Sequence, residues 1–74
     1  MKIRNMILRE NELEGMIEFL LEELEMMIDL MEVPKYQNST TLIEKFTTTT
    51  ERVNKLIKEK QELKHIIDAL EEMV

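Results

Sequence analysis

Apolar residues between Leu13 and Met31 recur at alternating spacings of four and three positions. This heptad pattern is typical of a coiled-coil helix, because it places the repeated positions on one side of an α-helix. With Ile17 at position a, the a and d positions form an apolar seam. The seam comprises Leu13, Ile17, Leu20, Leu24, Met27 and Met31.

The apolar positions of this segment extend beyond the seam on both sides. The additional residues are Leu21 and Ile28 at position e, Met16 and Leu30 at position g, and Phe19 and Met26 at position c. One neighbouring helix cannot cover so wide an arc. We therefore expect a bundle of at least four helices, or an arc that is partly left for a helix of another protein.

The predicted first helix runs from about residue 3 to residue 32. Ile3 and Met6 continue the seam upstream, which favours one continuous helix. Asn11 followed by Glu14 also matches an N-terminal capping pattern, and Gly15 costs about 1 kcal/mol inside a helix. The sequence leaves open a break near Asn11.

A second seam follows a polar connection at residues 33–40, where Pro34 disfavours helical geometry at Val33. Thr41 with Glu44 matches a capping box, which predicts a second helix at residues 41–73. Its seam comprises Leu42, Phe46, Thr49, Val53, Leu56, Lys60, Leu63, Ile67, Leu70 and Val74. Four consecutive threonines at 47–50 lower the helix propensity and leave a kink there open.

The two seams fit each other when the helices fold back antiparallel, because each a position then faces a d position. In this register the polar seam residues Glu10 and Lys60 fall in adjacent layers with opposite charge, and we predict that this pair sets the register. The register also predicts ion pairs beside the seam. These are Arg9 with Glu59, Glu14 with Lys64, and Glu23 with Lys45.

The predicted fold is all-α, an antiparallel hairpin of two long helices that forms a single domain over residues 1–74. A chain of 74 residues without Cys buries only a thin core by itself. Two hairpins that dimerise into a four-helix bundle would cover more apolar surface. The predicted dimer or partner interface comprises Met16, Phe19, Leu21, Met26, Ile28, Leu30, Ile43, Ile57 and Ile66.

Charge is unevenly distributed along the chain. The net charge is -6, which opposes binding to nucleic acid and to anionic lipid. Residues 10–32 contain nine acidic side chains and no basic one, whereas residues 45–64 contain six basic and three acidic side chains. The two halves therefore attract each other. Without Cys, a secretory leader or a long uninterrupted apolar stretch, we expect a cytoplasmic protein with no membrane partner.

Candidate chemistry is sparse. Glu62 and His65 form an E-x-x-H pattern of the kind that binds metal in helical bundles. They occupy positions c and f, which face solvent, so we predict no metal site. The acidic residues between Glu22 and Glu32 likewise lie on a polar face. With one Gly, one His and no Cys, the chain has no phosphate-binding loop or catalytic triad. We expect neither an enzyme nor a cofactor.

A basic surface on the second helix suggests an alternative function. It consists of Arg52, Lys55, Lys58 and Lys64. A dimer of hairpins resembles the architecture of Rop-type RNA-binding plasmid regulators, but this resemblance is one of fold alone. The acidic net charge and the lack of interleaved aromatic residues oppose nucleic-acid binding. We therefore predict a non-enzymatic protein-interaction module, such as a small regulator, adaptor or chaperone-like subunit. A Rop-like regulator and a purely structural oligomer are the alternatives.

Overall fold

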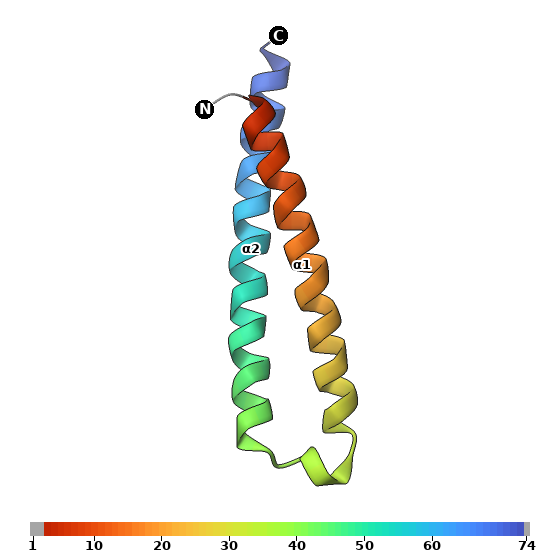
Figure 1. The fold of residues 1–74 in the computed structure, drawn as a ribbon. Coiled ribbons are helices and arrows are strands. Elements are labelled where there is room, and N and C mark those ends of the chain that lie inside the picture. Colours follow the sequence, from red (N-terminus) through yellow and green to blue (C-terminus); the bar gives the residue numbers. More distant parts are fainter. Residues whose placement is uncertain (1–2, 74) are drawn as a thin grey trace.

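The protein is a hairpin of two long antiparallel helices (Figure 1). The computed structural model describes residues 3–73, in which helix α1 (Ile3–Met31) and helix α2 (Thr40–Glu72) are joined by a short 3₁₀ helix, η1 (Pro34–Tyr36). No strand occurs within this range. The molecule is a rod with dimensions of 57 × 16 × 14 Å. The predicted all-α helical hairpin is confirmed, and each long helix begins and ends within a residue or so of the expected bounds.

The buried side chains all belong to the two predicted seams. They are Leu13, Ile17, Leu20 and Met27 in α1, and Thr49, Val53 and Ile67 in α2. The other seam residues within 3–73 are half-buried, and Val74 lies outside the described residues. The heptad spacing selects these positions because it turns every a and d side chain toward the neighbouring helix.

Both helices are continuous where the sequence left a break open. Helix α1 passes through Asn11, and helix α2 passes through its run of threonines. The hydroxyl of Thr47 donates a hydrogen bond to the carbonyl of Ile43 at 3.0 Å, and that of Thr50 donates to the carbonyl of Phe46 at 2.8 Å. These bonds satisfy the hydroxyls without displacing the backbone bonds of the helix.

The connection is held by its own local contacts. Val33 has an extended backbone, as expected for the residue before Pro34. The N–H of Tyr36 donates to the carbonyl of Val33 at 2.9 Å, and the N–H of Ser39 donates to the carbonyl of Tyr36 at 3.1 Å. The Lys35 ammonium lies 5.6 Å from the centre of the Tyr36 ring, a cation–π contact. Together these contacts reverse the chain direction between α1 and α2.

The N-terminus of α2 is capped by Ser39. The Ser39 side-chain oxygen accepts a hydrogen bond from the N–H of Leu42 at 3.2 Å, and the Ser39 backbone is extended, with φ -71° and ψ 109°. The capping box predicted at Thr41 is wrong. Because the helix already begins at Thr40, Thr41 has helical geometry, whereas a capping residue does not.

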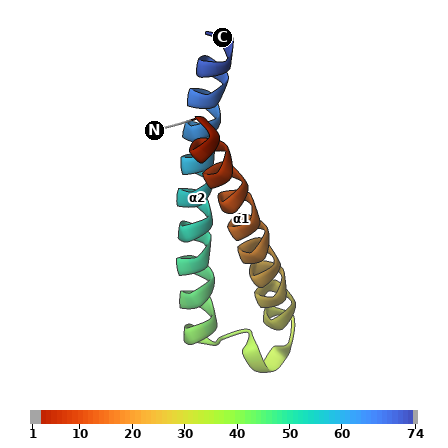
Figure 2. The ribbon, with the colours of Figure 1, turned by 45° about the horizontal axis from the view of Figure 1, so that its top comes forward.

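The two helices form one layer, and α1 crosses α2 at a small angle (Figures 1 and 2). The chain exposes 6027 Å² of surface. A compact monomer of 8.9 kDa exposes roughly 4,800 Å², about 1,200 Å² less. The excess arises because two helices side by side can cover only one side of each other. The hairpin therefore leaves much of its apolar surface in contact with solvent.

Replacing the cap tests the start of α2. We expect Ser39→Ala to lower the free energy of unfolding by about 1 kcal/mol, because the N–H of Leu42 loses its side-chain acceptor. Thr41→Ala is the matched control and should change it by no more than about 0.5 kcal/mol. Urea unfolding followed by circular dichroism measures both. A larger loss for Thr41→Ala than for Ser39→Ala would contradict the assignment of the cap.

Candidate protein interface

The hairpin has two lateral sides that differ in chemistry. One side carries the g positions, where Arg9 and Glu59 pair across the helices at 3.2 Å. The other side carries the e positions, where Glu14 lies 4.0 Å from Lys60. Because e and g positions flank the seam on opposite sides, the apolar residues outside the seam separate into two groups.

The first group is an aliphatic row at the e positions, which we name the e face. It consists of Ile7, Leu21 and Ile28 from α1 and of Ile43 and Ile57 from α2. Ile57 is half-buried, and the other four side chains are between 40% and 48% exposed. Both helices contribute to this face, so a neighbour that packs on it would contact both.

The second group lies on the opposite side, which we name the g face. Between residues 16 and 30 its apolar residues are Met16, Phe19, Met26 and Leu30 of α1, whereas the apolar g positions of α2, Ile66 and Met73, lie near the chain termini. Phe19 is 61% exposed and Met26 is 66% exposed, the largest values among the four on α1. Helix α2 supplies charged side chains on this side, Lys45 and Arg52. The g face therefore combines an apolar stripe on one helix with basic residues on the other.

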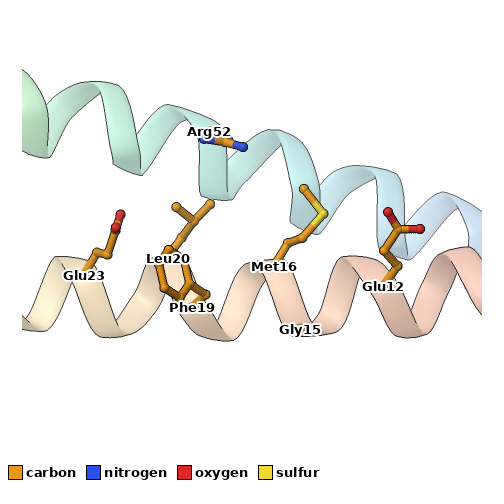
Figure 3. Close-up of a pocket in the computed structure, with 7 residues that line it drawn as sticks. All are labelled: Glu12, Gly15, Met16, Phe19, Leu20, Glu23 and Arg52. Atoms are coloured by element: carbon orange, nitrogen blue, oxygen red, sulfur yellow. The ribbon is translucent and has the colours of Figure 1, made fainter.

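Two neighbouring hollows lie on the g face. The larger, of about 430 Å³, is lined by Glu12, Gly15, Met16, Phe19, Leu20, Glu23 and Arg52 (Figure 3). The smaller, of about 230 Å³, is lined by Glu23, Met26, Met27, Leu30, Leu42 and Lys45. Figure 3 shows Met16 and Leu20 pointing from α1 toward α2, with Glu12 and Glu23 at either end. Because Glu23 lines both hollows, they adjoin each other along α1, and we refer to the two together as the groove.

Gly15 is the one lining residue of the larger hollow that has no side chain. It lies in the middle of α1, and its φ angle is not positive, so the backbone conformation does not require glycine at this position. A Cβ atom built at Gly15 would meet nothing within 4 Å. The position therefore offers free space beside Met16 and Phe19, and an approaching helix could come close to the backbone there.

The two walls of the groove differ in charge. Glu22 and Asp29 follow Phe19 and Met26 by three residues, so they border the apolar stripe on its outer side. On the α2 wall, Lys45 and Arg52 form no ion pair within 4.0 Å with any described residue. The α1 rim of the groove is thus acidic and the α2 rim basic.

Arg9 forms the ion pair that the register predicts. Its guanidinium lies 3.2 Å from Glu59 on α2 and also 3.1 Å from Glu12 on α1. The prediction for Arg9 and Glu59 is therefore confirmed, and one cation joins the two helices. The predicted pair of Glu23 with Lys45 is wrong. These two side chains line the same hollow without pairing.

The polar seam residues Glu10 and Lys60 are both half-buried and line a cavity of about 300 Å³. The Nζ atom of Lys60 lies 4.0 Å from Oε1 of Glu14. The predicted pair of Glu14 with Lys64 is wrong, because the seam lysine in the neighbouring layer reaches this carboxylate instead. That Glu10 and Lys60 set the register stays a prediction.

Glu62 and His65 lie on the outer surface of α2, away from the groove. They line a shallow hollow together with Lys58, Gln61 and Ile66. Within residues 3–73, no group of three or more His, Asp or Glu side chains is arranged to hold a metal ion. Ile66, which the sequence grouped with the interface, borders this hollow and lies apart from the groove.

The division into two faces was missed by the sequence analysis, which treated the exposed apolar residues as one set. The signal was present in the heptad positions of α2. Its e positions include Ile43 and Ile57, whereas its g positions include Lys45 and Arg52. Only the placement of α2 beside α1 shows that these charges line the groove next to Phe19.

Comparisons with known proteins give no relative for this chain: no protein-family model, no curated protein and no solved structure matches it. Neither α1 nor α2 has a stretch that is both long enough and apolar enough to cross a membrane, as judged over residues 3–73.

Charge reversal in the seam tests the role of Lys60. We expect Lys60→Glu to lower the free energy of unfolding by more than about 1 kcal/mol, because it sets like charges beside Glu14 and Glu10 in a half-buried layer. Lys58→Glu makes the same charge change at an exposed position and should cost no more than about 0.5 kcal/mol.

The pairing itself is tested by a double-mutant cycle. Glu10→Lys combined with Lys60→Glu should recover part of the stability that the single variants lose. Urea unfolding of all four proteins gives the coupling. Strictly additive effects would mean that Glu10 and Lys60 do not act as a pair.

Proposed function

We propose that this protein is a non-enzymatic protein-interaction module that acts as a homodimer of hairpins arranged as a four-helix bundle. The observation that carries the proposal is the apolar surface exposed on both sides of the hairpin. The excess surface of about 1,200 Å² exceeds the roughly 800 Å² per partner that a stable interface buries. A cysteine-free chain that gains stability by association suits the reducing cytoplasm, where we place it.

The e face is the better surface for the dimer. A four-helix bundle needs apolar side chains from every helix, and both α1 and α2 supply them on this side. Packing two copies through the g face would instead bury Lys45 and Arg52. Removing unpaired charges from water costs several kcal/mol for each ion. The dimer is therefore assigned to the e face.

The g face is then left for a different protein. It lies on the far side of each hairpin, so a dimer formed through the e face keeps it exposed. An exposed apolar patch of this kind is typical of an interaction site, and a groove beside an apolar stripe fits an amphipathic helix. Met16 and Met26 have flexible side chains that adapt to a partner, and Gly15 leaves room for close approach.

The charges on the groove walls describe the helix that fits best. The acidic rim on α1 includes Glu22 and Asp29, and the basic rim on α2 includes Lys45 and Arg52. A complementary helix carries an apolar stripe with basic residues along one flank and acidic residues along the other. A helix can lie in the groove in either direction, and reversing its direction exchanges its two flanks. A helix with one basic and one acidic flank therefore always has one direction in which each flank faces a rim of opposite charge.

The assignment of the two faces is tested by mass in solution. At micromolar concentration we expect the wild-type protein to have twice the chain mass of 8.9 kDa. Ile28→Glu should give monomer with a lower melting temperature, because it places a charge in the dimer interface. Phe19→Glu is the matched control at another exposed position of α1 and should leave the dimer intact. Light scattering coupled to gel filtration measures both.

Two results would contradict this assignment. A stable, folded wild-type monomer at micromolar concentration would exclude the dimer. Loss of the dimer in Phe19→Glu with retention in Ile28→Glu would place the interface on the g face, where the groove is then no longer free.

The groove is tested with three synthetic amphipathic helices of about 18 residues, long enough for five turns. All three share a leucine stripe. The mixed peptide carries Lys on one flank and Glu on the other, the second carries Glu on both flanks, and the third carries Lys on both flanks. Fluorescence anisotropy should show that the mixed peptide binds about fivefold or more tightly than the others, roughly 1 kcal/mol.

Variants of the groove give the controls for these peptides. Phe19→Glu should abolish binding, and Arg52→Glu should shift the preference to the peptide with Lys on both flanks. Equal binding of all three peptides, or binding that Phe19→Glu leaves unchanged, would contradict the proposed groove.

A further inference from the structure

The glycine in the groove indicates which kind of side chain a partner helix places there. We infer that the partner helix packs an aromatic side chain over Gly15, in the larger of the two hollows. This inference rests on the proposed groove and adds the residue type that the groove selects. Three features of the hollow support it: the free space at the glycine, the side chains around that space, and the size of the hollow.

Neither the fold nor the proposed dimer requires glycine at position 15. Glycine destabilises the interior of a helix relative to alanine, and the φ angle of Gly15 is one that any residue adopts. A Cβ atom at this position would meet nothing within 4 Å, so α2 does not approach it. Gly15 lies on α1 between Glu12 and Phe19 (Figure 3) and lines a hollow on the g face, which a copy packed on the e face does not cover. The space is therefore available to a molecule that binds in the groove.

The side chains that line this hollow favour an aromatic ring. Phe19 is 61% exposed, and its ring is accessible for pairing with another ring. Met16 supplies a thioether, which contacts aromatic rings favourably. Arg52 is exposed and forms no ion pair within 4.0 Å among residues 3–73, so its guanidinium is available to lie against a ring. An aliphatic side chain gains none of these three interactions.

The two hollows of the groove differ in size and in lining. The larger has a volume of about 430 Å³ and the smaller a volume of about 230 Å³. The smaller hollow is lined by neither an aromatic side chain nor a glycine, and its apolar wall consists of Met26, Met27, Leu30 and Leu42. Aromatic residues that fill well-packed pockets are frequent anchors of protein interfaces. The larger hollow therefore takes the aromatic side chain of the partner helix, and the smaller one takes an aliphatic side chain.

The test starts from the mixed peptide, which carries Lys on one flank and Glu on the other. In a set of variants of this peptide, each leucine of the stripe is replaced in turn by tryptophan. Because the charged flanks fix the direction of the helix, one of these positions lies opposite Gly15. We expect that tryptophan peptide to bind the wild-type protein about fivefold or more tightly than the leucine peptide, as measured by fluorescence anisotropy.

Substitution of Gly15 supplies the matching change on the protein. Gly15→Leu places a side chain in the hollow and should remove the advantage of the tryptophan peptide, while the leucine peptide loses less affinity. The two proteins and two peptides form a double-mutant cycle, in which non-additive effects isolate the contact at residue 15. Gly15→Ala should weaken binding of the tryptophan peptide by a smaller factor than Gly15→Leu. It should also raise the melting temperature by about 3 °C, which separates lost binding from unfolding.

Tryptophan emission gives an independent readout, because the protein itself contains no tryptophan. On binding to the wild-type protein, the emission maximum of the best tryptophan peptide should move to shorter wavelength as the ring leaves water. The shift should be smaller with Gly15→Leu, in which the ring is displaced from the hollow. An emission maximum that stays at the wavelength of the unbound peptide would overturn the inference.

The binding results distinguish the inference from the proposed groove. If no tryptophan peptide binds the wild-type protein more tightly than the leucine peptide, or if the effects in the cycle are additive, the inference is overturned. The proposed groove then still stands, provided that the mixed leucine peptide binds and that Phe19→Glu abolishes its binding. If no peptide of the set binds the wild-type protein, both the inference and the proposed groove are wrong.

Discussion

A pair of helices can bury only the side chains that lie between them, and this limit shapes the whole molecule. Within residues 3–73, all seven buried residues lie on the two seams, and Leu13 alone among them is fully buried. Neither lateral side is covered, so the aliphatic residues at the e positions and the stripe around Phe19 remain in contact with solvent. The case for a second copy and for a partner helix follows from this incomplete burial, because both would remove apolar surface from water.

The two lateral sides differ in a way that suits different kinds of partner. A two-fold interface must be complementary to itself, so it needs the same chemistry from both helices. The e face meets this condition through Leu21 and Ile28 on α1 and Ile57 on α2. The g face does not meet it at the groove, since there the apolar side chains lie on α1 and the basic ones, Lys45 and Arg52, on α2. Such a surface complements a helix with distinct flanks better than a copy of itself.

Contacts at the two ends of the hairpin hold the helices in one register, on which both faces depend. At one end Ser39 caps α2 directly after the turn, and toward the other end Arg9 links Glu12 with Glu59. Exposed ion pairs add little stability, about 0 to 1 kcal/mol each, so their effect is on alignment. A shift of one heptad would move Arg52 away from the hollow beside Phe19.

The sequence by itself determined the two helices, their antiparallel seam and the pairing of Arg9 with Glu59, because helical periodicity decides which side chains can be buried together. It predicted the cap of α2 at Thr41 instead of Ser39, since the two hydroxyls lie two residues apart and only the path of the turn distinguishes them. Lys60 rather than Lys64 reaches Glu14 because a long side chain can span neighbouring layers. Tertiary structure alone decided the separate e and g faces, because each face is formed by side chains of both helices and exists only when the two helices are packed together.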